Sequence, residues 1–183
     1  FYSEEGLREF VRFIESSREH LINDVIYLNS EKQGIPIEVA IMYNTGFSEN
    51  VHSYVNNINT IEGGTHLAGF RRALTRTLKK YAEDSKMLEK VKVEISGDDF
   101  REGLTAVISV KVAEPQFEGQ TKQKLGNSEA RGAVDSIVSR QLEIFLEQNP
   151  TVAKATVEKS VLAQRAREAA RKARDLTLSL IHI

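Results

Sequence analysis

A strand of alternating side chains is the feature that most constrains the fold. Leu104, Ala106, Ile108, Val110 and Val112 occupy every second position, and the residues between them are Thr, Val, Ser and Lys. A period of two is typical of a β-strand that buries one face. The strand runs into a loop that contains two glycines, at 119 and 126, and then into a helical pattern. The chain must therefore form a sheet with at least one covered face.

Three further runs are typical of strands. Residues 25–28 are rich in β-forming side chains, residues 37–43 alternate strictly, and residues 51–58 alternate more loosely. The segments 34–36 and 44–46 contain Gly, Pro and Asn, which favour turns. The sequence predicts a short antiparallel meander over these three runs.

Helical periodicity predicts the layers that cover the sheet. A short amphipathic helix is expected after Ser3, ending near residues 15–18, and a longer one over about residues 66–82 with Thr65 as its cap. Ser96 and Asp99 have the spacing of a capping box, which predicts a brief helical turn just before the 104–112 strand.

Two long helices are predicted after the loop. Asn127-Ser128 can cap a helix over residues 129–146, and Asn149-Pro150 ends it. The next helix spans about 151–174 and carries a stripe of small or apolar side chains, which are Ala155, Leu162, Ala166, Ala169, Ala170 and Ala173. We expect one α+β domain from which this C-terminal helical pair protrudes.

Composition limits the classes of protein without selecting one. The 183 residues are 40% hydrophobic and 28% charged, and the formal net charge is -1, so the overall charge does not indicate a nucleic-acid partner. The absence of cysteine excludes disulfides and thiolate chemistry and fits a reducing compartment. No apolar run reaches the roughly 18 residues of a membrane span and no signal-peptide pattern opens the chain, so we expect a cytoplasmic protein without membrane contact.

The glycine-bounded loop is the candidate functional segment. Gln120 offers a donor and an acceptor, Lys122 offers a mobile ammonium, and the glycines allow the backbone to come close to a ligand. Such a loop can contact a phosphate. On its own, the same pattern also fits a solvated polar connector.

A second candidate is the basic face of the helix at 66–82. It carries Arg71, Arg72, Arg76, Lys79 and Lys80, and Arg71 borders the apolar stripe, which limits where its head group can point. The charges fit either a phosphate-binding surface or an ordinary solvated helix face.

Three ordered motifs resemble one known family. They are residues 63–76 (GGTHLAGFRRALTR), 97–112 (GDDFREGLTAVISVKV) and 117–129 (FEGQTKQKLGNSE). Together they resemble the transducer domain of the DNA gyrase B family, over about residues 5–177. The resemblance implies a ribosomal protein S5 domain 2-like transducer fold over residues 1–177, with a core at about 20–148 and a long helix at about 151–177. Residues 178–183 depart from the family pattern and are interpreted as an atypical tail, a truncation or an artefact.

The resemblance also assigns roles. In that family the Gln-Thr-Lys loop contacts the terminal phosphate of ATP, which implies that Gln120, Thr121 and Lys122 bind ATP here and that Lys122 stabilises charge on that phosphate. Arg71 and Arg76 would line the cavity that receives the transported DNA. The general base and the Mg²⁺ ligand belong to the family's ATPase domain, so this segment alone is expected to be inactive. The implied partners are DNA, the gyrase A subunit and a second copy of the gyrase B chain, which dimerises through the ATPase domain.

Other chemistry finds little support. His20, His52, His66 and His182 lack the spacing of a metal site, and the adjacent Asp98 and Asp99 fit a cap better than an acid/base pair. The chain contains no Gly-x-Ser-x-Gly elbow, no P-loop and no Gly-x-Gly-x-x-Gly motif. Two alternatives stay open: the corresponding ATPase subunit of topoisomerase IV, and a freestanding RNA-binding module of the same fold, although the net charge counts against the latter.

Overall fold

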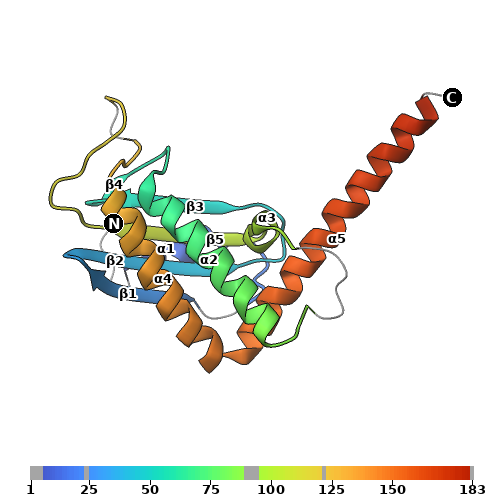
Figure 1. Ribbon diagram of the computed structural model, residues 1–183, viewed down its shortest axis with the longest axis horizontal. Helices are drawn as coiled ribbons and strands as arrows, with labels where there is room; N and C mark the ends of the chain where they lie inside the picture. The colour runs from blue at the N-terminus through green and yellow to red at the C-terminus, as the bar shows by residue number, and fades with distance from the viewer. Residues whose placement is uncertain (1–5, 23–24, 89–94, 121–122, 182–183) are drawn as a thin grey trace.

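A five-stranded mixed sheet forms the centre of the protein (Figure 1). The computed structural model describes residues 6–22, 25–88, 95–120 and 123–181. The strands are β1 (Ile26–Lys32), β2 (Ile35–Tyr43), β3 (Asn50–Val55), β4 (Ile58–Asn59) and β5 (Leu104–Val110). The helices are α1 (Leu7–Ile14), α2 (Thr65–Asp84), α3 (Gly97–Arg101), α4 (Ser128–Gln148) and α5 (Pro150–Ile181).

The strand order is β1-β2-β5-β3-β4, so the predicted meander is wrong in one respect. β5 inserts between β2 and β3, antiparallel to β2 and parallel to β3; Ala106 pairs with Ile41 on one side and Val51 on the other. The reason is that β5 carries apolar side chains on both faces, and Val107 on the second face is as buried as Ala106. A strand buried on both faces cannot pair its backbone groups with water, so it is favoured in the interior of a sheet, where strands on both sides supply the partners.

Two tight turns connect neighbouring antiparallel strands. Gln33 and Gly34 both have positive φ and form the two-residue turn between β1 and β2, so Ile35 and Pro36 belong to β2 rather than to the turn as predicted. Asn56 and Asn57 also have positive φ and join β3 to β4. The predicted turn at 44–46 does exist. It does not join adjacent strands, because the loop passes around Gly103, just before the first residue of β5, and β5 separates β2 from β3.

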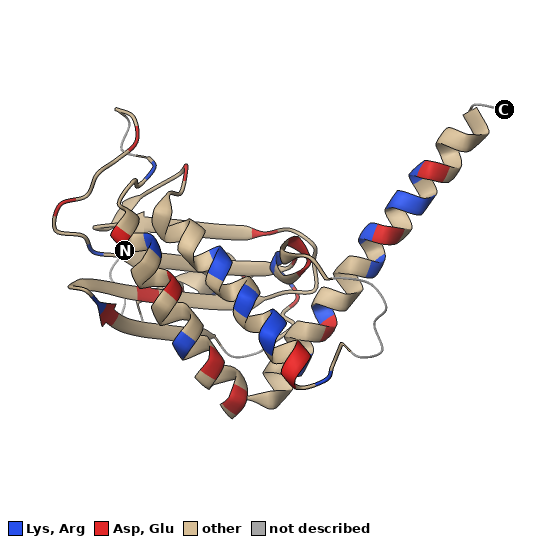
Figure 2. Cartoon of the chain, viewed as in Figure 1, with Lys and Arg blue, Asp and Glu red and all other residues tan. Residues whose placement is uncertain are grey.

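Helices cover both faces of the sheet. α2 and α4 lie side by side on one face, while α1 lies on the other, where Val11 packs with Ala40, Met42 and Val107 (Figure 1). α2 and α4 approach closely at Gly69, where a Cβ would lie 2.5 Å from the carbonyl oxygen of Arg131. The charged residues of both helices lie away from the sheet (Figure 2).

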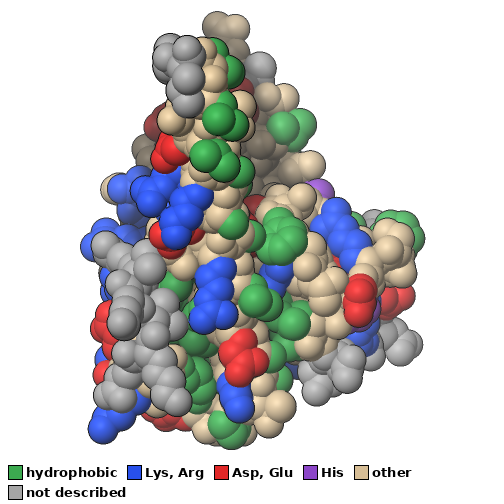
Figure 3. Space-filling view, turned by 90° about the vertical axis from the view of Figure 1, so that its right-hand side faces the viewer, with side chains coloured by type: hydrophobic (Ala, Val, Ile, Leu, Met, Phe, Trp, Pro, Cys, Tyr) green, Lys and Arg blue, Asp and Glu red, His purple; other side chains and the backbone are tan. Residues whose placement is uncertain are grey.

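The prediction that both C-terminal helices protrude is correct for only one of them. α4 packs on the sheet through a stripe that includes Val134, Val138 and Leu142, and α5 alone projects from the domain (Figures 1 and 3). α5 buries Ala153, Val157 and Ala163, whereas the predicted stripe at residues 166, 169, 170 and 173 is exposed. The stripe of small side chains predicted which face of α5 is buried. The face that α5 buries is a different one, because α5 packs against α3.

The predicted helix caps agree in part. Ser96 donates its backbone N–H to Asp99 Oδ2 at 2.9 Å, as the capping-box spacing predicts. Asn127 precedes α4 as expected, but α2 is preceded by Gly64, and Thr65 is its first residue. Ser3 lies outside the described residues, and α1 is preceded by Gly6.

Candidate functional site

The loop between β5 and α4 is a narrow hairpin. The backbone N–H of Gly126 donates to the carbonyl of Gln116 at 2.6 Å, and that of Glu118 donates to Lys124 at 2.8 Å. Gly119, near the tip, has a φ of +85°, a conformation that favours glycine. The two arms therefore hold each other up to Glu118 on one side and Lys124 on the other.

The base of the hairpin is joined to the start of α2. Leu125 donates its N–H to Gly63 at 3.1 Å and accepts from the N–H of Thr65 at 3.0 Å, and Glu62 donates to Gln123 at 2.9 Å. Gly64 lies flat against this bridge, since a Cβ there would overlap the backbone of Leu125. Two motifs that lie some 50 residues apart in the sequence thus form one structural unit, in which backbone contacts set the direction of the loop.

Asn127 secures the other side of the base. Its Oδ1 accepts the N–H of Gln116 at 2.6 Å, and its Nδ2 donates to the carbonyl of Glu114 at 3.2 Å and to Glu129 at 2.7 Å. The side chain is 3% exposed. The sequence predicted Asn127 as a helix cap, but its bonds to the segment before the hairpin could not be predicted from local pattern.

The tip carries the residues predicted to bind ATP. Gln120 lies in a turn and is exposed, which leaves its amide free to reach a ligand. Thr121 and Lys122 lie outside the described residues. Lys124, two residues further, pairs with Glu118 across the hairpin at 3.2 Å. The ammonium of Lys124 therefore already has an acidic partner within the loop.

A buried polar chain supports the same end of the sheet. His66 is fully buried in α2, and its Nε2 lies 3.1 Å from Thr60 Oγ1, which in turn lies 2.8 Å from Ser53 Oγ. Burial lowers the pKa of His66 to about 4, so the ring is neutral at pH 7. No local pattern indicated this role, because Ser53 and Thr60 acquire it only when β3 and β4 pair.

The basic face of α2 is engaged in ion pairs. Arg71 Nε lies 2.9 Å from Glu49, whereas Arg76 lies 2.5 Å from Asp135 on α4. Residues five apart on a helix point about 140° apart, so the two arginines flank the exposed face of α2 from opposite sides. The structure thus does not bring Arg71 and Arg76 together, and each already has an acidic partner.

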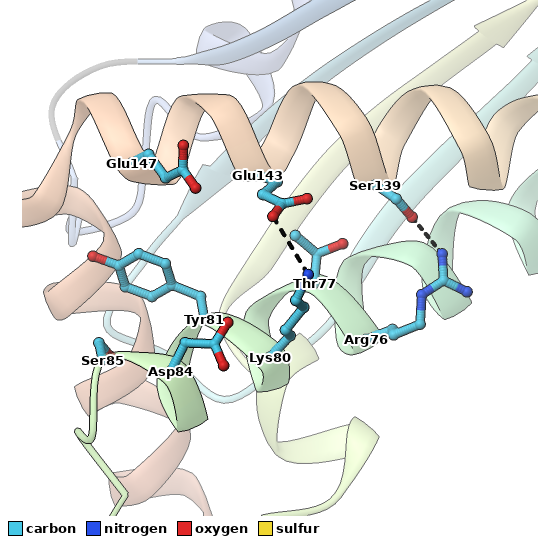
Figure 4. A pocket seen from close by; sticks show the side chains of 9 residues that line it. All are labelled: Arg76, Thr77, Lys80, Tyr81, Asp84, Ser85, Ser139, Glu143 and Glu147. Carbon is cyan, nitrogen blue, oxygen red and sulfur yellow. Dashed lines mark hydrogen bonds and ion pairs between the residues drawn. The ribbon is translucent and has the colours of Figure 1, made fainter.

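A cleft of about 530 Å³ separates the C-terminal half of α2 from α4 (Figure 4). Its lining mixes Arg76 and Lys80 with Asp84, Glu143 and Glu147, and Lys80 pairs with Glu143 at 3.5 Å. The carboxylates disfavour a phosphate there. Within the described ranges, no group of three or more His, Cys, Asp or Glu side chains has the geometry of a metal site.

Comparison with known proteins identifies the family. The family model described as DNA gyrase B matches residues 6–176. The chain belongs to the DNA gyrase B family. It is 67% identical over 176 residues to the gyrase B protein of Cytophaga hutchinsonii, and the match covers 96% of this chain and 37% of that relative. The segment therefore spans little more than a third of the length of that relative.

Solved structures agree with the gyrase B assignment. The ATPase domain of Thermus thermophilus gyrase B, described as a 43K domain in complex with an aminocoumarin, matches with a TM-score of 0.89 and 38% identity, over 96% of this chain and 47% of that one. The ATP-binding domain of Francisella tularensis topoisomerase IV, in complex with a small-molecule inhibitor, matches with a TM-score of 0.78 and 29% identity, over 91% and 44%. The mixed α/β fold is thus that of the gyrase B structures. In the portion of the chain that the structure describes, no helix is long and apolar enough to cross a membrane.

Proposed function

We propose that this segment is the transducer domain of a cytoplasmic, ATP-dependent DNA gyrase. In this role it couples ATP binding and hydrolysis to the passage of one DNA duplex through another, and so to negative supercoiling. The observation that carries the proposal is the hairpin anchored on Gly64, whose base lies at one end of the domain while α5 leaves from the other (Figure 1). A loop at one end and a lever at the other is the arrangement that a coupling domain needs.

The hairpin tip is the proposed sensor of ATP. Gln120 and Thr121 hydrogen-bond to the terminal phosphate, and Lys122 stabilises the negative charge that develops on it during hydrolysis. When that phosphate leaves, the tip loses its partner, and this domain can rotate relative to the ATPase domain of the full-length protein. ATP itself, with Mg²⁺, is held by the ATPase domain of the full-length protein rather than by this segment.

The partners follow from the same proposal. The full-length protein dimerises through its ATPase domain, assembles with the gyrase A subunit and acts on DNA. Arg71 and Arg76 face the transported duplex, which they contact through its phosphates without regard to sequence.

The comparisons favour gyrase over the alternatives. The relative from Cytophaga hutchinsonii, which is 67% identical over 96% of this chain, is a gyrase B subunit. The segment also belongs to a family of topoisomerase subunits, which argues against a freestanding RNA-binding module.

Replacing Lys122 tests the proposal. In the full-length protein, Lys122→Ala should reduce ATP turnover at least tenfold with unchanged circular dichroism, because it removes a charge directed at the transition state. Gln120→Ala should be milder, since a neutral hydrogen bond contributes less than a charge-assisted one. Lys124→Ala is the matched control, because Lys124 pairs with Glu118 and should not touch the phosphate.

Two results would contradict this assignment. Near-normal turnover in Lys122→Ala would remove the sensor role. An equal loss in Lys124→Ala would show that the charge of the loop as a whole, rather than one ammonium, affects turnover.

A further inference from the structure

α5 is fixed to the domain by a buried lysine. Lys159 is 4% exposed, and its Nζ donates to the carbonyl oxygen of Thr45 at 3.1 Å and lies 3.9 Å above the centre of the Phe47 ring. Burial lowers the pKa of Lys159, which shows that its surroundings cost the charged form some hydration. A lysine is almost never buried this deeply unless its ammonium has a partner.

Two turns further along, an ion pair fixes α5 again. Arg167 donates to Asp99 Oδ2 at 2.9 Å. Asp99 is 1% exposed, and the same oxygen accepts from the N–H of Ser96, so the pair also involves the cap of α3. The other carboxylate oxygen, Oδ1, has no partner among the described residues.

Both contacts reach the segment that enters the central strand. Asp99 lies in α3, directly before β5, and Thr45 lies in the 44–48 loop, which is hydrogen-bonded to Gly103 on both sides at 2.8 and 3.2 Å. From Gly103 the chain runs straight through β5 to the hairpin at 116–126. β5 is therefore a rigid connection between the place where α5 is held and the base of the loop that carries Gln120.

Beyond this second contact, the hydrogen bonds and ion pairs of α5 in the described structure join residues of α5 to one another. All residues from 169 to 181 are exposed, and the helix extends away from the domain (Figures 1 and 3). Any force that passes between the domain and the free part of α5 must pass through the residues that precede it.

We propose that Lys159 and Arg167 are positioning residues that transmit movement of the ATP-sensing hairpin to α5. This inference rests on the proposed function of the segment. Lys159 holds the first turns of α5 to the loop at the entrance of β5, and Arg167 holds the last packed turn to α3. When the hairpin and β5 move as one body, these two contacts make α5 move with them.

The test separates transmission from simple stabilisation. Full-length proteins carrying Arg167→Gln, Asp99→Asn, both changes together, or Lys159→Met are assembled with the gyrase A subunit. DNA-dependent ATP turnover and supercoiling rate are measured on the same samples, and the supercoils introduced per ATP hydrolysed are compared. A variant that merely lowers the fraction of folded enzyme reduces both rates equally and leaves this ratio unchanged.

We expect ATP turnover within twofold of the parent and at least a fivefold fall in supercoils per ATP for each single variant. The double variant should be no worse than Asp99→Asn alone, because that change already removes the charge that Arg167 contacts. The matched control is Arg171→Gln, one turn further along α5, where Arg171 pairs, among the described residues, only with Glu168 of the same helix at 3.9 Å. Its ratio should equal that of the parent.

An unchanged ratio in Arg167→Gln and Lys159→Met would overturn the inference, and so would an equal loss in Arg171→Gln. This outcome differs from failure of the proposed function, which appears as normal ATP turnover in Lys122→Ala.

Discussion

Single residues decide where the functional loop points. Gly64, with a φ of +134°, is the clearest case, because it combines a backbone conformation that side chains rarely adopt with direct contact against Leu125. The direction of the hairpin thus depends on the absence of a side chain in another element.

Gly64→Ala should displace the hairpin and reduce ATP turnover in the full-length protein to about the level of Lys122→Ala, since the methyl group overlaps the Leu125 backbone. The control is Gly132→Ala in α4, where a Cβ would meet nothing within 4 Å. That change should leave turnover intact and raise stability by about 0.5–1 kcal/mol. Normal turnover in Gly64→Ala would mean that the bridge to Leu125 does not position the tip.

His66 makes stability depend on pH. Its pKa falls from 6.5 to about 4 on folding because the ring is buried, so the unfolded chain binds the extra proton between these values. The free energy of unfolding carries the full contribution of the neutral His66 ring above pH 6.5. It falls by about 3 kcal/mol as the pH decreases from 6.5 to 4. His66→Gln should flatten this part of the stability curve, measured by urea unfolding at several pH values. Parallel curves for His66→Gln and the parent would contradict the assignment.

At the scale of elements, α2 and α4 form a layer with two functions. Their inner faces cover the sheet. Their outer edges are joined by ion pairs, which are those of Arg76 with Asp135 and of Lys80 with Glu143. Exposed pairs of this kind contribute only about 0–1 kcal/mol each. Their larger effect is to reduce the positive charge that the outer face of α2 presents to its surroundings.

The paired arginines lead to a prediction about DNA. Replacing both Arg71 and Arg76 with Gln should weaken DNA stimulation of ATP turnover and its dependence on salt, while turnover without DNA stays nearly unchanged. Arg71 should matter more, because it borders the apolar stripe of α2, which limits where its head group can point. Asp135→Asn should act in the opposite sense, since it releases Arg76 from its partner.

These effects are measured as ATP turnover against DNA concentration at two salt levels. If DNA stimulation and its salt dependence are the same in the parent and in every variant, the arginines form a solvated helix face, and the DNA role is wrong.

At the scale of the whole molecule, rigidity is distributed unevenly. β5 pairs on both sides and is covered on both faces, whereas the last turns of α5 are exposed all round. An isolated helix as short as the exposed part of α5, residues 169–181, is only marginally stable in water. The domain therefore combines a rigid centre with a helix whose end depends on whatever surrounds it.

Hydrogen exchange tests this distribution. Backbone amides of β5 should exchange only through global unfolding, and those of residues 169–177 should exchange at least about 100-fold faster in the isolated segment. Equal protection of both regions would show that the end of α5 has a partner, such as a second copy of the segment.

The sequence by itself determined the local structure and the family. Alternation in 104–110, the stripe of α2, the capping box of Ser96 and the start of α4 after Asn127 depend on neighbours within a few residues, so local sequence patterns are enough to predict them. The three ordered motifs likewise identify the gyrase B family, because their residue types and their order along the chain are properties of the sequence alone.

Only the tertiary structure decided which elements meet. Periodicity shows that a face is buried but not what buries it, so it could not place β5 between β2 and β3 or choose the packed face of α5. The contacts of Gly64 with Leu125, Lys159 with Thr45 and Arg167 with Asp99 join residues some 60 to 115 positions apart. Such pairs depend on the summed packing of the whole chain, and no local pattern encodes them.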